Sequence, residues 1–122
     1  MAIVALFVHR NRVEAEAKLQ GDIRRLEACF RRIGYESSLV PSDGKLPFPA
    51  CLEKWEFIER HRLFFVVNRV PDIRTAAPNT ILSESKARYD GGNLVLMVDG
   101  TIAIRAGDGT MKLKKKAVLK PD

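Results

Sequence analysis

Arginine is the residue type in this chain that is best suited to bind a charged partner. Two arginine pairs stand seven residues apart, Arg24 with Arg25 and Arg31 with Arg32. A seven-residue step returns to nearly the same face of an α-helix, so the spacing predicts one exposed basic stripe. Guanidinium groups donate paired hydrogen bonds to phosphates or carboxylates, which predicts an anionic partner. The opposite interpretation is a solvated charged face on which Glu27 pairs with Arg31.

Lysine is concentrated near the C-terminus, where the segment 112–120 carries five lysines. The first four of them are Lys112, Lys114, Lys115 and Lys116. They could hold a phosphate backbone electrostatically without reading sequence. The alternative is an edge strand protected by lysine, followed by a basic and frayed tail over residues 112–122.

A third group of polar residues is expected at the carboxyl ends of parallel strands, where open α/β sheets bind ligands. These residues are His9, Arg10, Asn11 and Arg12, then Ser42, Asp43 and Lys45, and then Asn68, Arg69 and Arg74. The residues around Asn11 would also lie at a helix N-terminus, which attracts anions, although Asn11 could simply cap the helix. The predicted anion-binding set therefore also includes Arg10, Arg12, Arg69 and Arg74.

One short string has the spacing of a catalytic motif. Pro71-Asp72 is followed, after eleven residues, by Glu84-Ser85-Lys86. The string resembles the PD…(D/E)xK pattern of the restriction-endonuclease-like metal nucleases. That resemblance implies that Asp72 and Glu84 hold Mg²⁺ while Lys86 positions or activates the attacking water. The family has a helix after the lysine, whereas this chain has Asp90-Gly91-Gly92 and a predicted hairpin.

Other reaction classes lack support in the sequence. Neither GxGxxG nor GxxxxGK[ST] occurs, which disfavours a dinucleotide or P-loop enzyme. The serines have no nucleophile-elbow context, and Cys29 and Cys51 lack the spacing of a zinc site. We therefore expect no cofactor, and no metal outside the nuclease hypothesis.

The composition is that of a small soluble domain. A length of 122 residues and a hydrophobic content of 46% suffice for a single core. The net charge of +6 favours an anionic partner, although it could also serve solubility alone. The apolar run at the N-terminus is too short for a signal peptide or a membrane span, and two cysteines suit a reducing interior. We expect a cytoplasmic protein that does not bind membranes.

The elements of the N-terminal half are predicted to alternate. The apolar run Ala2–Val8 indicates a buried strand, and a helix should follow between Asn11 as N-cap and Gly34 as its end. Its buried positions, at steps of four and three, are Leu19, Ile23, Leu26, Phe30 and Ile33. Tyr35–Val40 is predicted as a strand and Pro41–Pro49 as a loop.

A second helix should begin at Pro49, with Leu52, Trp55 and Ile58 on its buried face, and Leu63–Val67 should form another apolar strand. All four of the following aromatic residues are expected on core faces, which disfavours base stacking: Phe30, Trp55, Phe64 and Phe65.

The C-terminal third is predicted to be a β-meander. Asp72–Thr80 is expected as a loop, and Ile81–Tyr89 fits a strand or a short helix. Asp99-Gly100 indicates a tight hairpin turn. The predicted strands around this turn and the next are Leu94–Val98, Thr101–Arg105 and Thr110–Lys114.

Together these elements predict one α+β domain over residues 1–122, with an α/β-like N-terminal half. The expected order is β-α-β-α-β followed by the meander, in a mixed sheet of about five to six strands with two main helices. Dimerisation through a sheet face is a further expectation, because two helices barely cover three apolar strands.

The leading functional hypothesis is a non-enzymatic module that binds an anionic macromolecule, with nucleic acid held through its phosphates as the first choice. The alternative is a small protein-interaction or inhibitory module that docks an acidic partner surface through the arginine helix. The second alternative is a metal-dependent nuclease that uses Asp72, Glu84 and Lys86.

Overall fold

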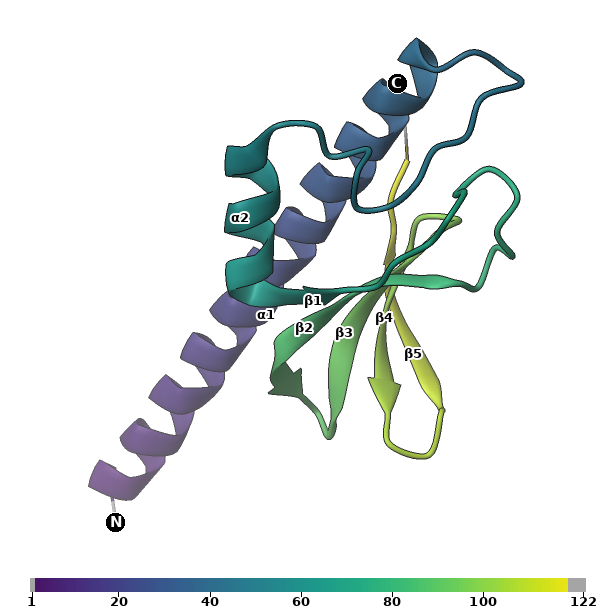
Figure 1. The fold of residues 1–122 in the computed structure, drawn as a ribbon. Coiled ribbons are helices and arrows are strands. Elements are labelled where there is room, and N and C mark those ends of the chain that lie inside the picture. The colour runs from purple at the N-terminus through teal and green to yellow at the C-terminus, as the bar shows by residue number, and fades with distance from the viewer. Residues whose placement is uncertain (1, 119–122) are drawn as a thin grey trace.

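The computed structural model describes the backbone of residues 2–118 and the side chains of residues 12–118 (Figure 1). Two helices come first, α1 (Ala2–Leu39) and α2 (Trp55–Phe64). Five strands follow, β1 (Phe65–Val67), β2 (Ile81–Tyr89), β3 (Gly92–Met97), β4 (Thr101–Ala106) and β5 (Met111–Lys116). They form one sheet in the order β1-β2-β3-β4-β5. The chain therefore has an α+β fold, as predicted.

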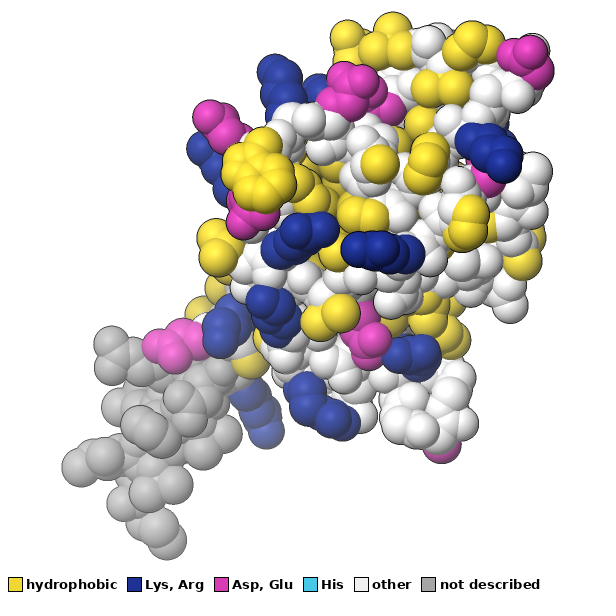
Figure 2. All heavy atoms as spheres, in the orientation of Figure 1, with side chains coloured by type: hydrophobic (Ala, Val, Ile, Leu, Met, Phe, Trp, Pro, Cys, Tyr) yellow, Lys and Arg dark blue, Asp and Glu magenta, His cyan; other side chains and the backbone are white. Residues whose placement is uncertain are grey.

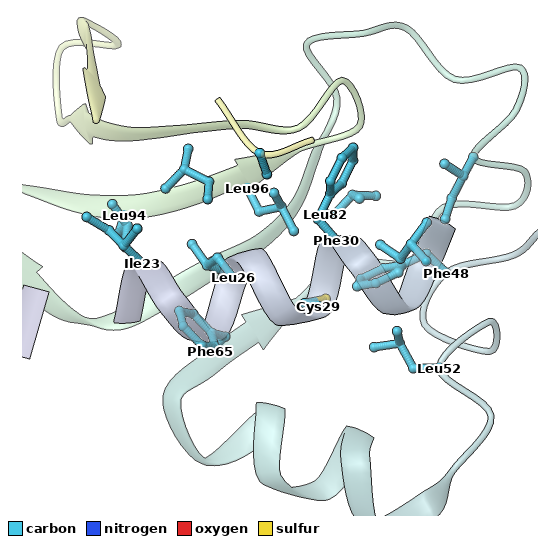
Figure 3. Packing of buried hydrophobic residues seen from close by; sticks show 14 of the residues in the cluster. Ile23, Leu26, Cys29, Phe30, Phe48, Leu52, Phe65, Leu82, Leu94 and Leu96 are labelled. Carbon is cyan, nitrogen blue, oxygen red and sulfur yellow. The ribbon is translucent and has the colours of Figure 1, made fainter. Parts of the chain in front are cut away.

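The amphipathic pattern of α1 is confirmed by its packing. The five positions predicted to be buried, Leu19, Ile23, Leu26, Phe30 and Ile33, are each no more than 6% exposed. They pack against the sheet, where Leu82, Leu94 and Leu96 point toward the helix (Figure 3). The N-terminal part of α1 extends beyond the sheet as a projecting arm (Figure 1).

The predicted strands at Ala2–Val8 and Tyr35–Val40 are wrong, because α1 runs without interruption from Ala2 to Leu39. A short apolar run fits a buried strand and a helix equally well. Gly34 lies inside the helix, where glycine costs only about 1 kcal/mol relative to alanine. Asn11 is likewise inside α1 and does not cap its start. The helix ends near Pro41, which disfavours a helical conformation in the residue before it.

The second helix was predicted to begin too early. α2 starts at Trp55, and the segment from Pro49 to Leu52 is a turn in which the Leu52 N–H donates to the Pro49 carbonyl at 2.9 Å. Leu52 and Ile58 are buried as predicted, but Trp55 is 72% exposed. Strand β1 begins at Phe65, so the predicted strand residues Leu63 and Phe64 belong to the last turn of α2.

The predicted parallel crossovers are wrong, because every neighbouring pair of strands is antiparallel. Both helices precede all five strands, so no strand–helix–strand unit exists among residues 2–118. The sheet is accordingly antiparallel and not mixed. The residues assigned to the carboxyl ends of parallel strands therefore do not form a common rim.

The β-meander prediction is confirmed. β3 and β4 pair around the Asp99-Gly100 turn, and Ile81–Tyr89, which was ambiguous from sequence, is strand β2. Gly100 has a φ of 90°, and a Cβ at this position would lie 2.7 Å from the Ala117 carbonyl oxygen. Only glycine fits this turn without displacing the end of β5. β5 is an exposed edge strand, as its lysines indicated.

The two faces of the sheet differ in their cover. α1 packs on the face that carries Leu94, Leu96 and Ile102. The opposite face holds a small second cluster formed by Val95, Met97 and Ala103. Neither helix of the described chain is long and apolar enough to cross a membrane.

Candidate binding surfaces

The arginine stripe of α1 divides between two sides of the helix. Arg24 is exposed and has no ion-pair partner among the side chains of residues 12–118. Arg31 contacts the Glu27 carboxylate at 3.6 Å. Arg25 and Arg32 face the other side of the helix. Arg25 binds Asp22 at 3.0 Å, and Arg32 binds Glu36 at 2.8 Å. Three of the four predicted arginines are therefore partly neutralised within the chain.

Strand β5 meets the arginine stripe at Glu27. The Lys115 ammonium lies 2.9 Å from Glu27 Oε2, which is the same oxygen that Arg31 contacts. The Arg31 and Lys115 side chains are 60% and 51% exposed, whereas the Glu27 side chain is only 12% exposed. The acid therefore lies beneath two accessible cations and joins the helix to the strand.

The other lysines of β5 divide by strand register. Lys112 pairs with Ile104, which faces α1, so Lys112 lies on the same face of the sheet as Lys115. Lys116 binds Asp99 at 2.9 Å, and Lys114 falls at an irregularity in the pairing of β4 with β5. We refer to Arg24, Arg31, Lys112 and Lys115 as the α1–β5 basic surface.

Arg74 is a structural residue and not an exposed anion ligand. Its guanidinium donates to the carbonyls of Ser37 at 2.8 Å and Val40 at 2.7 Å, and to those of Pro41 and Gly44 in the following loop. Two of these carbonyls also accept from backbone N–H groups, Pro41 from Gly44 at 2.9 Å and Ser37 from Val40 at 3.4 Å. Arg74 therefore fastens the loop after β1 to the end of the helix.

The three residues of the nuclease motif are placed in separate interactions. Asp72 Oδ1 accepts hydrogen bonds from the backbone N–H groups of Leu46 at 3.2 Å and Arg74 at 3.1 Å. Both Glu84 carboxylate oxygens accept from Arg105 at 2.9 Å, and Lys86 is exposed on β2. Within the described part of the chain, no group of three or more His, Cys, Asp or Glu side chains is arranged to hold a metal ion.

The remaining predicted residues lie far apart along the chain. Arg10 falls outside the residues whose side chains are described, as do His9 and Asn11. Arg12 is exposed on the projecting arm of α1. Arg69 follows β1 and is exposed beside α2.

An exposed apolar surface on α2 and β1 was not predicted from the sequence. Trp55 is 72% exposed, Leu63 68%, Val66 55% and Phe64 38%. Figure 2 shows hydrophobic side chains exposed over α2, with Lys and Arg side chains beside them. The adjacent pair Leu63-Phe64 carried a signal, because neighbouring helical residues cannot both face one core. Trp55 and Phe64 lie on opposite sides of α2, with Leu63 between them on its exposed half. We refer to Trp55, Leu63, Phe64 and Val66 together as the α2 surface.

Arginines border the α2 surface. The Arg25 guanidinium carbon lies 3.8 Å from the centre of the Phe64 ring, a cation–π contact between α1 and α2. Arg60 and Arg62 are exposed on α2 itself. Arg62 lies 3.8 Å from Glu59, and both side chains of this pair are about half exposed. The α2 surface thus combines large apolar side chains with accessible positive charge.

A groove of about 610 Å³ runs along one side of α2. Its floor is made of buried apolar residues, namely Phe48, Leu52, Ile58 and Val70. Its rim carries Trp55, Arg62 and Arg69. Its lining is mainly apolar.

His61 lies on the buried face of α2 and joins the helix to the sheet. Its Nε2 is 2.8 Å from Ser83 Oγ on β2, and its ring stacks on Phe65 at 4.6 Å between centroids. Burial lowers the pKa of His61 from 6.5 to about 4, so the imidazole is neutral near pH 7. A neutral buried ring with an apolar neighbour and one hydroxyl partner has a packing function here.

The two cysteines are also core residues. Cys29 and Cys51 are buried, and neither forms a disulfide. Burial raises the pKa of Cys51 to about 12 and that of Cys29 further still. Thiols held in the protonated form are poor nucleophiles and poor metal ligands.

No protein-family model, no curated protein and no solved structure matches this chain.

Proposed function

We propose that this chain is a non-enzymatic interaction module that docks another protein through the α2 surface. The observation that carries the proposal is the exposure of four large apolar side chains on one helix and the strand that follows it. Burying a side chain of this size contributes about 1.5–3 kcal/mol to association. Exposed apolar side chains forgo this free energy while they remain in water, and a partner that covers them best explains their exposure.

The composition of the surface supports a protein partner. Tryptophan and arginine are the residues most enriched at the energetic centres of protein interfaces. Trp55 lies with Arg62 on one side of α2, and Phe64 lies with Arg60 and Arg25 on the other side. The accessible arginines favour a partner whose apolar contact is bordered by acidic residues. This proposal moves the docking site from the arginine stripe of α1 to α2.

The proposal includes a reducing compartment such as the cytoplasm, and it admits a second copy of the chain as the partner. Two free buried cysteines suit a reducing environment. A homodimer would bury the α2 surface of both copies at once, as a two-fold interface requires.

A photo-crosslinking experiment tests the docking surface. A benzoylphenylalanine would replace Leu63, which is 68% exposed on α2. The matched control carries it at Asp108, an exposed residue in the turn between β4 and β5. We expect irradiation in cells to give one discrete adduct from position 63 and none from position 108. The adduct should be lost in the double variant Arg60→Glu, Arg62→Glu.

Adducts of equal yield from both positions, or none from position 63, would contradict the docking proposal. An adduct of twice the mass of the chain would identify the partner as a second copy.

A second candidate function is nucleic-acid binding by the α1–β5 basic surface. The contact of Arg31 and Lys115 with one Glu27 oxygen favours it, because helix and strand then present their cations on a common surface. Its four cations outnumber the one acid that pairs with two of them: Arg24, Arg31, Lys112 and Lys115 against Glu27. Such a surface suits phosphate contacts without base readout.

Salt dependence tests this second candidate. Fluorescence anisotropy with labelled single- and double-stranded DNA and RNA should show affinity that falls steeply between roughly 50 and 200 mM salt. The double variant Arg24→Ala, Arg31→Ala should flatten the slope by about two ions. Absence of binding at low salt, or a slope that the variant leaves unchanged, would count against nucleic acid.

A further inference from the structure

The groove beside α2 has one wall formed by a single face of the helix. Trp55, Ile58 and Arg62 all line it, and their spacing of three and four residues places them on one stripe of α2. A rise of 1.5 Å per residue separates Trp55 from Arg62 by about 10 Å along the helix axis. The groove therefore has an aromatic end and a cationic end, with buried Ile58 between them.

The opposite wall is a short piece of extended chain. Phe48 and Val70 exchange two backbone hydrogen bonds, from Phe48 N–H at 2.8 Å and from Val70 N–H at 3.1 Å. Neighbouring residues in extended chain point to opposite sides, so buried Val70 leaves Arg69 at the rim. These hydrogen bonds hold the backbone of Val70, the residue after Arg69, against Phe48.

The charges of the groove are available to a ligand and are unevenly placed. Arg69 has no ion-pair partner among the described side chains. Arg62 has only the 3.8 Å contact with half-exposed Glu59, and an exposed pair of this kind is worth less than about 1 kcal/mol. Glu53 lines the groove two residues before Trp55. The Trp55 end therefore carries an acid in sequence, whereas Arg62 puts a positive charge about 10 Å away along α2.

The groove is open along its length, which selects between classes of ligand. Trp55 at its mouth is 72% exposed. Pockets for small molecules bury roughly 70–90% of the ligand surface, and this groove would leave one side of such a ligand in water. Grooves lined by aromatic residues and apolar side chains recognise extended peptide segments. Pro47, Pro49 and Pro71 add further rigid apolar lining.

The geometry points to a specific peptide chemistry: the groove binds an extended segment of the partner that carries a large apolar residue followed, two positions later, by Asp or Glu. Side chains two apart in an extended chain lie on one side and about 7 Å apart, which fits between Trp55 and the arginine end. The apolar side chain contacts Trp55 and Ile58, and the carboxylate pairs with Arg62 and Arg69. This inference rests on the proposed docking of a protein partner.

A displayed library of random heptapeptides tests the inference on the full chain. We expect selected peptides to share an apolar residue with Asp or Glu two positions later. Trp55 is the only tryptophan in the chain, so its emission should shift to the blue when a selected peptide without tryptophan binds. Arg69→Glu should lower the affinity for a fluorescein-labelled selected peptide at least tenfold. A peptide in which lysine replaces the Asp or Glu should bind this variant again.

Arg24→Glu serves as the matched control, because it makes the same charge reversal at an exposed arginine on α1 and should leave peptide affinity unchanged. Equal thermal melting curves for both variants and the parent chain would show that folding is intact. Selected peptides without an acidic residue, or equal affinity for Arg69→Glu and the parent, would overturn the inference. Displacement of the peptide by oligothymidine would overturn it as well, since the groove would then stack bases.

The two failures are distinguishable. An adduct from position 63 with no selected peptide would retain the docking function and reject the groove chemistry. Loss of that adduct together with the peptides would reject both.

Discussion

The two basic regions of this molecule use their charge differently. On the α1–β5 basic surface, Arg31 and Lys115 both contact Glu27, an acid that is 12% exposed. Beside α2, Arg69 has no acidic partner among the described side chains, and Arg62 has a distant one at 3.8 Å. In the first region part of the charge holds a strand against a helix. In the second it lies free beside exposed apolar side chains.

The number of cations in a sequence segment is therefore a poor measure of the charge available for binding. Arginine binds acids and carbonyls within its own chain as readily as those of a partner. The stripe on α1 has the higher density of arginine, yet three of its four side chains have internal partners. Accessible charge next to apolar surface is the combination that favours recognition.

The largest expected effect is a difference in the free energy of unfolding between variants of Arg74, which binds backbone carbonyls, and of Arg69, which is exposed. Arg74→Ala removes donors to four carbonyls at the end of α1 and should lower the free energy of unfolding by roughly 2–4 kcal/mol. Arg69→Ala should change it by less than about 0.5 kcal/mol. Urea unfolding measures both values. Equal losses would mean that Arg69 also has a structural contact, and the distinction between the two regions would fail.

Acid should weaken the support beneath the α2 surface. His61 has a pKa near 4 in the folded chain against 6.5 as its ordinary value, so the unfolded chain binds more protons between these pH values. Stability should therefore fall as pH falls from 6.5 to 4, by up to about 3 kcal/mol. Urea unfolding at steps between pH 7 and pH 4.5 checks this.

His61→Gln is the control for the pH experiment, because its amide retains a hydrogen-bonding group for Ser83 and does not titrate. This variant should lose most of the slope above pH 4.5. A slope that persists in the glutamine variant would assign the acid sensitivity to other groups.

The smallest expected effect concerns Glu27, the acid that both Arg31 and Lys115 contact. Glu27→Gln breaks the ion pairs of Arg31 and Lys115, but both partners are more than half exposed, so the loss should stay within about 1 kcal/mol. The same variant leaves one more uncompensated charge on the α1–β5 basic surface. Nucleic acid bound there should bind a few-fold more tightly at low salt.

Glu59→Gln is the matched change on α2, where Glu59 pairs with Arg62. It should leave both stability and nucleic-acid affinity unchanged. Tighter nucleic-acid binding by this variant would place the nucleic-acid site on α2 and remove the distinction between the two regions.

Local spacing was enough for the elements whose stability comes from neighbouring residues. The steps of four and three from Leu19 to Ile33 predicted the buried face of α1, because that pattern fits only a helix against a core. Asp99-Gly100 predicted its hairpin, because the turn needs the positive φ that Gly100 adopts. The lysines of β5 predicted an exposed edge for the same kind of local reason.

The candidate sites depended on contacts between distant residues, which spacing does not encode. Arg74 meets the end of α1 more than thirty residues away in the chain, so its structural function could not be seen beside it in sequence. Trp55 is exposed because α2 begins there and not at Pro49. The groove exists because Phe48 pairs with Val70.

Residue type and short-range periodicity were enough to predict the amphipathic centre of α1, the β-meander and the overall positive charge. Three features were established by tertiary packing alone: that α1 is one helix, that the sheet is antiparallel, and which arginines have no acidic partner among the described side chains. An apolar run or a guanidinium group fits several environments equally well, and packing against distant parts of the chain selects among them.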